Sequence, residues 1–414
     1  MAVYSYIRKG DYVYQEKKPV NLNVLLGSLF LGYSMVYIDK LSVGISIVSI
    51  SKDIPMTEST KGLILSAFFI GYALMQIPMS FAINKFGARS VVIFSVILIG
   101  IFDFIFGLSQ SIQMLIAVRL LSGMFAHSGY ASASSKEVID NFPVERRTFA
   151  KGILISSSGF AGVIGPILLS PLIEMKGWRF AYTLLTIVSL VIAFIISSSI
   201  PKKDKNQKQS ASTAKKIPIL SVWKNPTIWF LFFAAFFINS LLYGLNNWLP
   251  TFLVSYRGIT LPQSGMISSA VGVFALTGAI GGSYIVGKFF RNQDKKVIMV
   301  TSSIGSILAF ASYFVYKPIN FILVLGFATL FLTLGFVTLM AIPMKMFSGE
   351  VFAPSYSTIA TGGIIGGAVV QLVIGFLVES SETFLTAFIY FLCLGLLTAA
   401  SLIFVKIPSQ NESI

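Results

Sequence analysis

The stretch FLGYSMVYIDKLSVGIS, residues 30–46, is an apolar run that carries an acid and a base side by side, Asp39 and Lys40. Similar apolar stretches follow one another along the whole chain of 414 residues, which is 55% hydrophobic and only 11% charged. A soluble domain is about a quarter charged, and a helix of roughly 20 apolar residues is long enough to cross a bilayer. Because a helix satisfies its own backbone groups in lipid, the sequence predicts an all-α integral membrane protein.

Twelve membrane spans can be placed on the hydropathy pattern, and a polar linker separates them into two groups of six. The spans are predicted at 22–48, 60–83, 90–109, 112–138, 149–173, 179–200, 226–254, 262–287, 296–316, 319–347, 355–378 and 382–405. The stretch PKKDKNQKQSASTAKK, residues 201–216, is basic and poor in apolar residues, which is typical of a flexible linker. Two six-helix halves around a central path are typical of alternating-access transporters.

This pattern gives the following expected organisation: an N-terminal segment at 1–21, a first six-helix bundle at 22–200, a linker at 201–225, a second six-helix bundle at 226–405 and a tail at 406–414.

The basic residues are distributed unevenly over the predicted loops. With both chain ends on one side, and with residues at the ends of spans counted with the adjacent loop, 23 of the 31 Lys and Arg fall on that side and 6 on the other, while 2 lie deep inside spans. Cytoplasmic loops of membrane proteins carry an excess of Lys and Arg. We therefore expect both termini to be cytoplasmic in a multi-pass protein of the cell membrane. The net charge of +15 is explained by this topology, so it does not indicate nucleic-acid binding.

The loop after the second span resembles a known signature. In SFAINKFGARS, residues 80–90, the positions of Lys85, Gly87 and Arg89 match the cytoplasmic loop of the major facilitator superfamily, where a glycine, an acid, a base and then Gly-x-Arg follow in order. Ser80 and Asn84 stand where that family usually has glycine and aspartate. The usual ionic partner of the loop is thus missing, and we expect gating there to rely on neutral hydrogen bonds. The predicted gating residues are Asn84, Lys85, Gly87 and Arg89.

Further stretches in both halves are similar to one branch of that superfamily, the anion:cation symporter family. They are YIDKLSVGIS (37–46), FFIGYALMQIP (68–78), RLLSGMF (119–125) and WFLFFAAFFINSLLYGLNNWLPTFLVSYRG (229–258). The resemblance implies a twelve-helix fold of two halves and a transporter of organic anions, often sugar acids, which many family members move together with protons.

Lys40 and Arg119 are the two basic residues that we place deep in spans. A cation at the centre of a bilayer costs about 2.5–3.5 kcal/mol on insertion scales, and such residues usually face a cavity or a partner. Lysine provides a point charge and arginine a bidentate fork for a carboxylate. We expect both to contact an anionic substrate. Pairing of Lys40 with Asp39 and snorkelling of Lys40 to the interface remain as alternatives.

Asp39 is the predicted proton carrier, because low-dielectric surroundings disfavour the charged form of a carboxylate. The resemblance implies the same role, since the aspartate at this position is among the coupling groups of the family. Family members also carry a glutamate seven residues after the arginine, where this chain has Ala126, followed by its only histidine, His127. Histidine titrates near neutral pH, so His127 is a second candidate for proton coupling, beside a purely structural role. For Asp103, in the third span, we expect a role in packing or at a helix interface.

Neutral polar residues at helical spacing are the remaining candidates for the substrate site. Tyr72 and Gln76 are four residues apart in the second span, and Asn239, Tyr243 and Asn247 follow the same spacing in the seventh. A polar face has no benefit towards lipid, so these residues should face the central path, although helix–helix hydrogen bonding is an alternative.

These residues favour a secondary transporter of a small organic anion, a sugar acid or related carboxylate, with proton coupling. An organophosphate or other anion exchanger, a uniporter, an exporter of amphipathic compounds and a non-transporting receptor are the alternatives. We identify no set of catalytic residues, no metal cluster and no nucleotide-binding loop in the sequence. We therefore expect no enzyme activity and no cofactor. The expected partners are the anionic substrate, protons and the lipid bilayer, for a protein that acts as a monomer.

Overall fold

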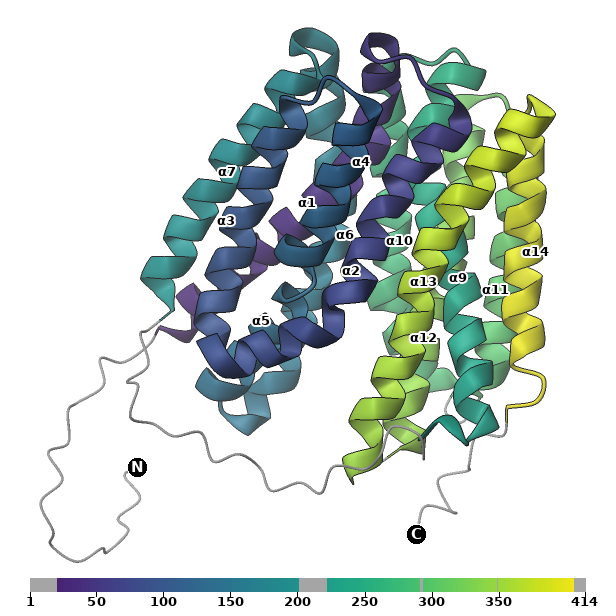
Figure 1. The fold of residues 1–414 in the computed structure, drawn as a ribbon. Helices are drawn as coiled ribbons and strands as arrows, with labels where there is room; N and C mark the ends of the chain where they lie inside the picture. Colours follow the sequence, from purple (N-terminus) through teal and green to yellow (C-terminus); the bar gives the residue numbers. More distant parts are fainter. Residues whose placement is uncertain (1–20, 201–221, 291–292, 348, 406–414) are drawn as a thin grey trace, which may run out of the picture.

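The computed structural model describes residues 21–200, 222–290, 293–347 and 349–405, and within these ranges its regular elements are helices (Figure 1). The predicted linker at 201–225 lies outside the described residues except for its last four positions. The predicted tail at 406–414 and all but the last residue of the segment 1–21 also lie outside them.

The helices of the first half form one bundle, and those of the second half form another beside it (Figure 1). The elements of the first half are α1 (Leu22–Asp53), α2 (Glu58–Phe86), α3 (Ala88–Gly107), α4 (Ile112–Leu121), the π-helix η1 (Ser122–His127), α5 (Tyr130–Asn141), α6 (Val144–Lys176) and α7 (Trp178–Ser199). Those of the second half are α9 (Pro226–Thr251), the π-helix η2 (Phe252–Tyr256), α10 (Leu261–Phe289), α11 (Asp294–Ser312), α12 (Pro318–Met346), α13 (Gly349–Ser381) and α14 (Leu385–Ser401).

Polar residues cap the N-terminal ends of several helices. The Asn21 side chain accepts hydrogen bonds from two backbone N–H groups of the first turn of α1, and Thr57 caps α2 in the same way. Such caps satisfy donors that a helix leaves unpaired at its N-terminus. Gly87 and Gly177 have φ angles of 85° and 81°, in the region that favours glycine, and they permit the abrupt turns from α2 to α3 and from α6 to α7.

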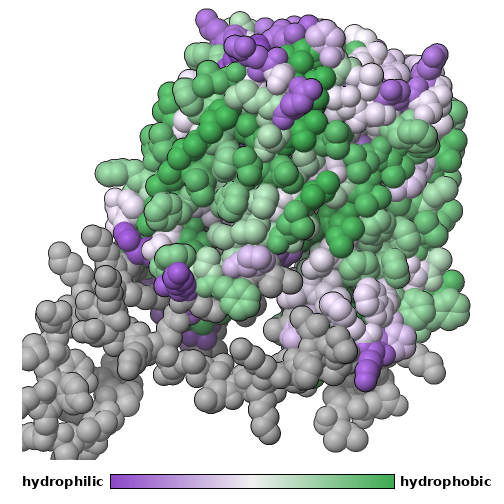
Figure 2. Space-filling view, in the orientation of Figure 1, coloured by the Kyte–Doolittle hydropathy of each residue, from purple (hydrophilic) through white to green (hydrophobic). Residues whose placement is uncertain are grey.

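The helices have the length and surface expected in a membrane. Among the described residues, nine helices are long and apolar enough to cross a bilayer, and α14 is a shorter apolar helix. Large apolar side chains are exposed on the outside of the bundle, including Phe94, Leu168 and Phe194. On the face shown in Figure 2, an apolar band separates hydrophilic residues at the two ends of the molecule. A surface of this kind is stable in lipid rather than in water.

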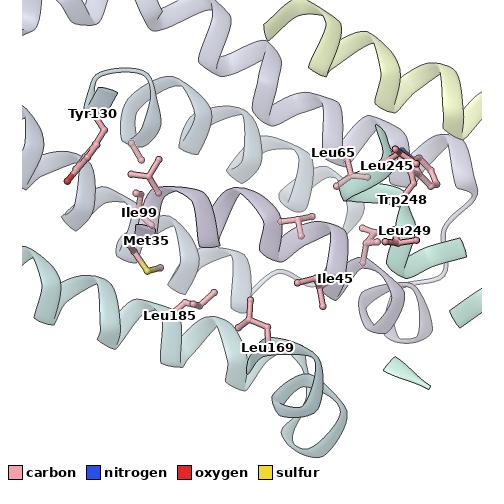
Figure 3. Close-up of a cluster of buried hydrophobic side chains, with 14 of the residues drawn as sticks. Met35, Ile45, Leu65, Ile99, Tyr130, Leu169, Leu185, Leu245, Trp248 and Leu249 are labelled. Carbon is pink, nitrogen blue, oxygen red and sulfur yellow. The ribbon is translucent and has the colours of Figure 1, made fainter. Parts of the chain in front are cut away.

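The two halves share one buried core at the end of the bundle where α1 ends and α2 begins, which we call the distal end. Figure 3 shows Ile45 of α1 and Leu65 of α2 near Leu245 and Trp248 of α9, and all four belong to one cluster of buried apolar side chains. The end at which α1 begins and α14 ends is called the terminal end.

Glycines permit close approach of the two halves at the distal end. A Cβ atom at Gly375 of α13 would lie 2.6 Å from the Glu58 carbonyl oxygen and 3.0 Å from Ser59 Cα, both in α2. A Cβ atom at Gly265, in the second turn of α10, would lie 2.6 Å from the Pro166 carbonyl oxygen of α6. The Glu379 carboxylate of α13 also accepts a hydrogen bond of 2.7 Å from the Ser59 N–H at the start of α2. These contacts close the distal end.

A β-branched residue at Gly375 should therefore open the distal end. In Gly375→Val, the added side chain overlaps backbone atoms of α2, so the two helices must separate. We expect spin labels at Lys52 and Lys317, two exposed residues at the distal end of opposite halves, to shift to longer distances in a Cys393→Ser background. In the control Gly27→Val, nothing lies within 4 Å of the added Cβ, and the distances should stay as in the parent. Unchanged distances in Gly375→Val would contradict this account of closure.

Candidate functional site

Asp39 is the centre of a buried charged cluster inside the first half. The residue lies in the middle of α1 and is 2% exposed. Arg119, on the last turn of α4, directs Nη1 at both carboxylate oxygens, each 3.4 Å away. His127, at the end of η1, places Nε2 2.6 Å from Oδ2 of the same carboxylate. A buried cation and a buried carboxylate compensate each other's loss of water, and the cluster brings together three of the residues singled out from the sequence.

The π-helix η1 and two glycines let these side chains meet. A π-helix is wider than an α-helix and often occurs at functional sites; η1 lies between Arg119 and His127. A Cβ atom at Gly123 would lie 2.9 Å from Tyr72 N, and one at Gly71 would lie 3.0 Å from Met124 N. Only glycine permits so close an approach of α2 to this turn. The sequence motif RLLSGMF thus includes both the cluster's arginine and the glycine that lets α2 pack over it.

Lys40 has different surroundings from its neighbour Asp39. Successive side chains of a helix diverge by about 100°, and Lys40 points away from the carboxylate towards the second half, where Nζ donates a hydrogen bond of 2.9 Å to Tyr243 Oη of α9. Nζ lies 4.1 Å from the centre of the Tyr243 ring and 4.8 Å from that of Phe69. Tyr37, Phe68 and Tyr72 each place a ring centre 5.9 Å away. Aromatic rings at these distances stabilise a cation.

Phe68 of α2 separates Lys40 from the cluster. Its ring is fully buried, the Arg119 guanidinium carbon lies 4.5 Å from its centre, and the His127 ring packs against it at 4.7 Å with an angle of 84° between the ring planes. Lys40 therefore lies between the two halves, whereas Arg119 lies behind the Phe68 ring and contacts Asp39.

The neutral polar residues do not all face the same region, although their helical spacing predicts a common face. Tyr72 and Gln76 are partly exposed on α2, and the Tyr72 ring stacks on Phe68 at 6.3 Å. Asn239 donates its amide hydrogen to Ala235 O of its own helix, at 2.9 Å. Asn247 is buried where a Cβ atom at Gly44 would come within 2.8 Å of its carbonyl oxygen. Tyr243 is thus the member of this set from the second half that contacts Lys40.

Asp103 of α3 lies beside the cluster, at a helix interface in the interior of the first half. Its side chain is 2% exposed and lies within hydrogen-bonding reach of the Asp39 carboxyl group. The signal in the sequence was an acid in the middle of an apolar span, in IFDFIFG, because an ionisable residue there is generally functional.

The loop between α2 and α3 is arranged around Gly87 at the terminal end. Arg89 donates from Nε to Ile200 O at 2.8 Å and from Nη2 to Ser197 O at 2.7 Å, both at the end of α7. Lys85 is exposed beside the Phe86 ring, at 5.2 Å. The Asn84 side chain lies outside the described residues. Arg89 therefore ties the loop to α7 within the first half.

Two helical bundles with charged residues in the bundle interior are typical of membrane transporters. The sequence matches the Major Facilitator Superfamily over residues 29–353, and the chain belongs to this family. In shape it is similar to a bacterial homologue of the human lysosomal transporter Spinster, crystallised in an inward-facing and occupied conformation, with a TM-score of 0.74 over 94% of this chain and 95% of that one. The sequence identity is 18%, so this likeness shows the fold alone.

Three curated relatives are 25% identical to the chain. They are a probable sulfoacetate transporter of Cupriavidus necator, which aligns over 87% of this chain and 88% of the relative; a hexuronate transporter of Bacillus subtilis, over 91% and 92%; and a probable galactarate/D-glucarate transporter of Escherichia coli K12, over 95% and 97%. The family and these relatives are transporters, in agreement with the expectation that the chain is no enzyme.

The different surroundings of Arg119, which is buried, and Lys40, which is partly exposed, predict different effects on stability. Arg119→Ala leaves the Asp39 carboxylate without its arginine, and breaking a buried ion pair in this way costs about 3–5 kcal/mol. We expect a lower melting temperature for the purified protein in detergent. The double variant Arg119→Ala/Asp39→Asn should recover part of the loss, because it removes the uncompensated charge. Lys40→Met, which keeps an apolar side chain among the rings, should melt close to the parent. Equal losses in Arg119→Ala and Lys40→Met would contradict this division.

Proposed function

We propose that this transporter is a secondary active carrier of a small organic anion, a sugar acid or related carboxylate, coupled to protons by alternating access. The observation that carries the proposal is the placement of Lys40, a cation in the membrane interior that lies between the halves and whose neighbour Asp39 belongs to a buried cluster with a histidine. The three relatives are named as transporters of sulfoacetate, hexuronate and galactarate or glucarate, and each of these compounds is an anion.

We further propose twelve spans with both termini on the cytoplasmic side, as the distribution of Lys and Arg supports. With this topology the distal end faces outwards. Its closure by the contacts between α2 and α13 and between α6 and α10 then corresponds to an inward-facing conformation. The loop of Asn84, Lys85, Gly87 and Arg89 then lies at the cytoplasmic side, where rearrangement of the halves opens and closes the path.

The site residues take distinct roles in this proposal. Lys40 attracts the anion and forms a charge-assisted hydrogen bond to it, in place of its bond to Tyr243. Tyr72, Gln76 and Tyr243 present polar groups for the rest of the substrate. Asn239 and Asn247, predicted substrate contacts on α9, must turn from their present positions to reach it. Arg119 contributes its positive field from behind Phe68 and contacts the anion directly only after the Phe68 ring has moved.

Coupling is assigned to the cluster around Asp39. A carboxylate that contacts both an arginine and a histidine changes its interactions with each when a proton binds, since a protonated carboxyl group donates one hydrogen bond and loses its negative charge. His127 is the second member of the cluster that can hold a proton. Because Asp39 and Lys40 are joined by one peptide bond in α1, a shift of the helix that follows protonation also moves the proposed anion-binding lysine.

Substrate charge should determine recognition. A neutral sugar with the same hydroxyl pattern should compete at least about tenfold more weakly than its acid, which corresponds to about 1.4 kcal/mol. Lys40→Met should remove this preference, because the contact that distinguishes the two ligands is lost. Both expectations are measured with the purified protein in liposomes. Uptake of a radiolabelled hexuronate or sulfoacetate is inhibited with the unlabelled acid or with the neutral sugar, in the parent and in Lys40→Met. If the neutral sugar competes as well as the acid in the parent, the anion-binding role of Lys40 is wrong.

Proton coupling should be lost when an ionisable side chain of the cluster is replaced, whereas substrate binding and exchange should be retained. Asp39→Asn mimics a permanently protonated carboxyl group, so it should still exchange labelled for unlabelled substrate across liposomes, since exchange does not need the proton to leave. It should fail at accumulation driven by a pH gradient. His127→Gln should show the same pattern if the histidine takes part. The ratio of accumulation to exchange is the quantity to compare, and a parent-like ratio in Asp39→Asn would assign the aspartate a structural role.

A further inference from the structure

The Asp39–Asp103 contact identifies a second acid in the membrane interior of the first half. Both side chains are buried, and the two carboxyl groups lie within hydrogen-bonding reach of each other. An ionised carboxylate only accepts hydrogen bonds, whereas a protonated one also donates. Two carboxyl groups can therefore share a hydrogen bond only when one of them carries a proton. A hydrogen bond between these two neighbours therefore requires a bound proton.

The formal charges of the cluster also indicate one bound proton. Asp39 and Asp103 are acids, Arg119 is permanently cationic, and His127 is neutral or cationic. With both acids ionised and the histidine neutral, the cluster has one net negative charge in surroundings that disfavour uncompensated charge. A single proton makes the cluster neutral. The cluster is therefore suited to take up one proton and to release it again.

The contacts indicate which acid holds the proton. Asp39 accepts from Arg119 with both of its oxygens and lies against His127, so its ionised form has two cationic or donating partners. Asp103 has fewer partners, and its Oδ2 has none among the described residues. An ionised Asp39 and a protonated Asp103 that donates to it satisfy the contacts of both groups.

The other titratable groups on helices packed against α3 make their contacts elsewhere and not with Asp103. From α7, the Tyr182 hydroxyl lies 3.0 Å from Ser42 Oγ and 3.0 Å from Ser46 Oγ of α1. From α5, Glu137 accepts a hydrogen bond of 2.9 Å from Asn141 of the same helix. From α2, Tyr72 stacks on Phe68. Arg119 of α4 and His127 of η1 belong to the cluster itself.

We propose that Asp103 is a proton-binding residue of this transporter, which shares one proton with Asp39 and releases it during the transport cycle. The inference deepens the proposed coupling mechanism and rests on it. When the proton leaves, both acids are ionised and their hydrogen bond is lost. The like charges then repel each other across the contact between α1 and α3, until reprotonation restores the bond.

Infrared spectroscopy tests the protonation without any substrate. In the parent at neutral pH, the carbonyl stretch of a protonated carboxylic acid should be present and should disappear on alkaline titration. This band should be absent in Asp103→Asn. Asp140→Asn, which changes an exposed acid at the end of α5, should retain it. If Asp103→Asn does not fold, Asp103→Glu keeps the carboxyl group and should retain the band at a shifted position. A band that persists in Asp103→Asn, or an unshifted band in Asp103→Glu, overturns the proposal.

Transport assays then test the coupling role. Asp103→Asn should retain exchange and lose accumulation driven by a pH gradient, whereas Asp140→Asn should perform both like the parent. Loss of the infrared band with parent-like accumulation overturns the role of Asp103 in coupling. Failure of the proposed function is distinguishable, because the parent itself would then show no gradient-driven uptake of any anion while the infrared result for Asp103 stood unchanged.

Discussion

The buried contact between Asp39 and Arg119 constrains the whole first half. Removing two charges from water costs several kcal/mol per ion unless they are close and well oriented, so α1 and α4 must meet at this depth and no other. The π-helix η1 brings His127 to the same carboxylate. Gly71 and Gly123 let α2 pack against the turn, and the Phe68 ring covers it. A polar contact of three side chains thus determines the register of four helical elements, which apolar packing alone leaves free to slide.

The same contact explains how adjacent residues of opposite charge can serve different purposes. Asp39 is directed into the first half, where it is paired, and Lys40 is directed towards the second half, where it has a hydroxyl and aromatic rings but no carboxylate among the described residues. A lysine that lacks a neutralising acid retains its attraction for an external anion. The pairing of Asp39 with Arg119 is what leaves Lys40 available, because Arg119 satisfies the acid that lies next to the lysine in the chain.

Much of the fold follows from hydropathy, whereas the site depends on which helices become neighbours. Apolar length predicts the helices because each span must satisfy its backbone within itself, and the cap at Thr57 accounts for the two extra residues at the start of α2. Helical geometry explains why Asp39 and Lys40 point in different directions. It does not reveal that Arg119 points to α1, that Asn239 bonds within its own helix, or that α3 brings Asp103 to Asp39. Those outcomes depend on helix neighbours and on a local π-helix, and neither is visible in the spacing of a single sequence.

The contact of Lys40 with Tyr243 links this site to the arrangement of the two halves. A lysine between the bundles needs a partner in every conformation, since an uncompensated cation is costly in the membrane interior. With the distal end closed, the Tyr243 hydroxyl of α9 and the surrounding aromatic rings are the partner of Lys40. Separation of α1 from α9 at this level removes it. An arrangement in which the halves part at the site is therefore disfavoured unless another group, such as a bound anion, takes the place of the tyrosine. The same lysine that attracts a ligand thereby makes movement of the halves depend on whether a ligand is present.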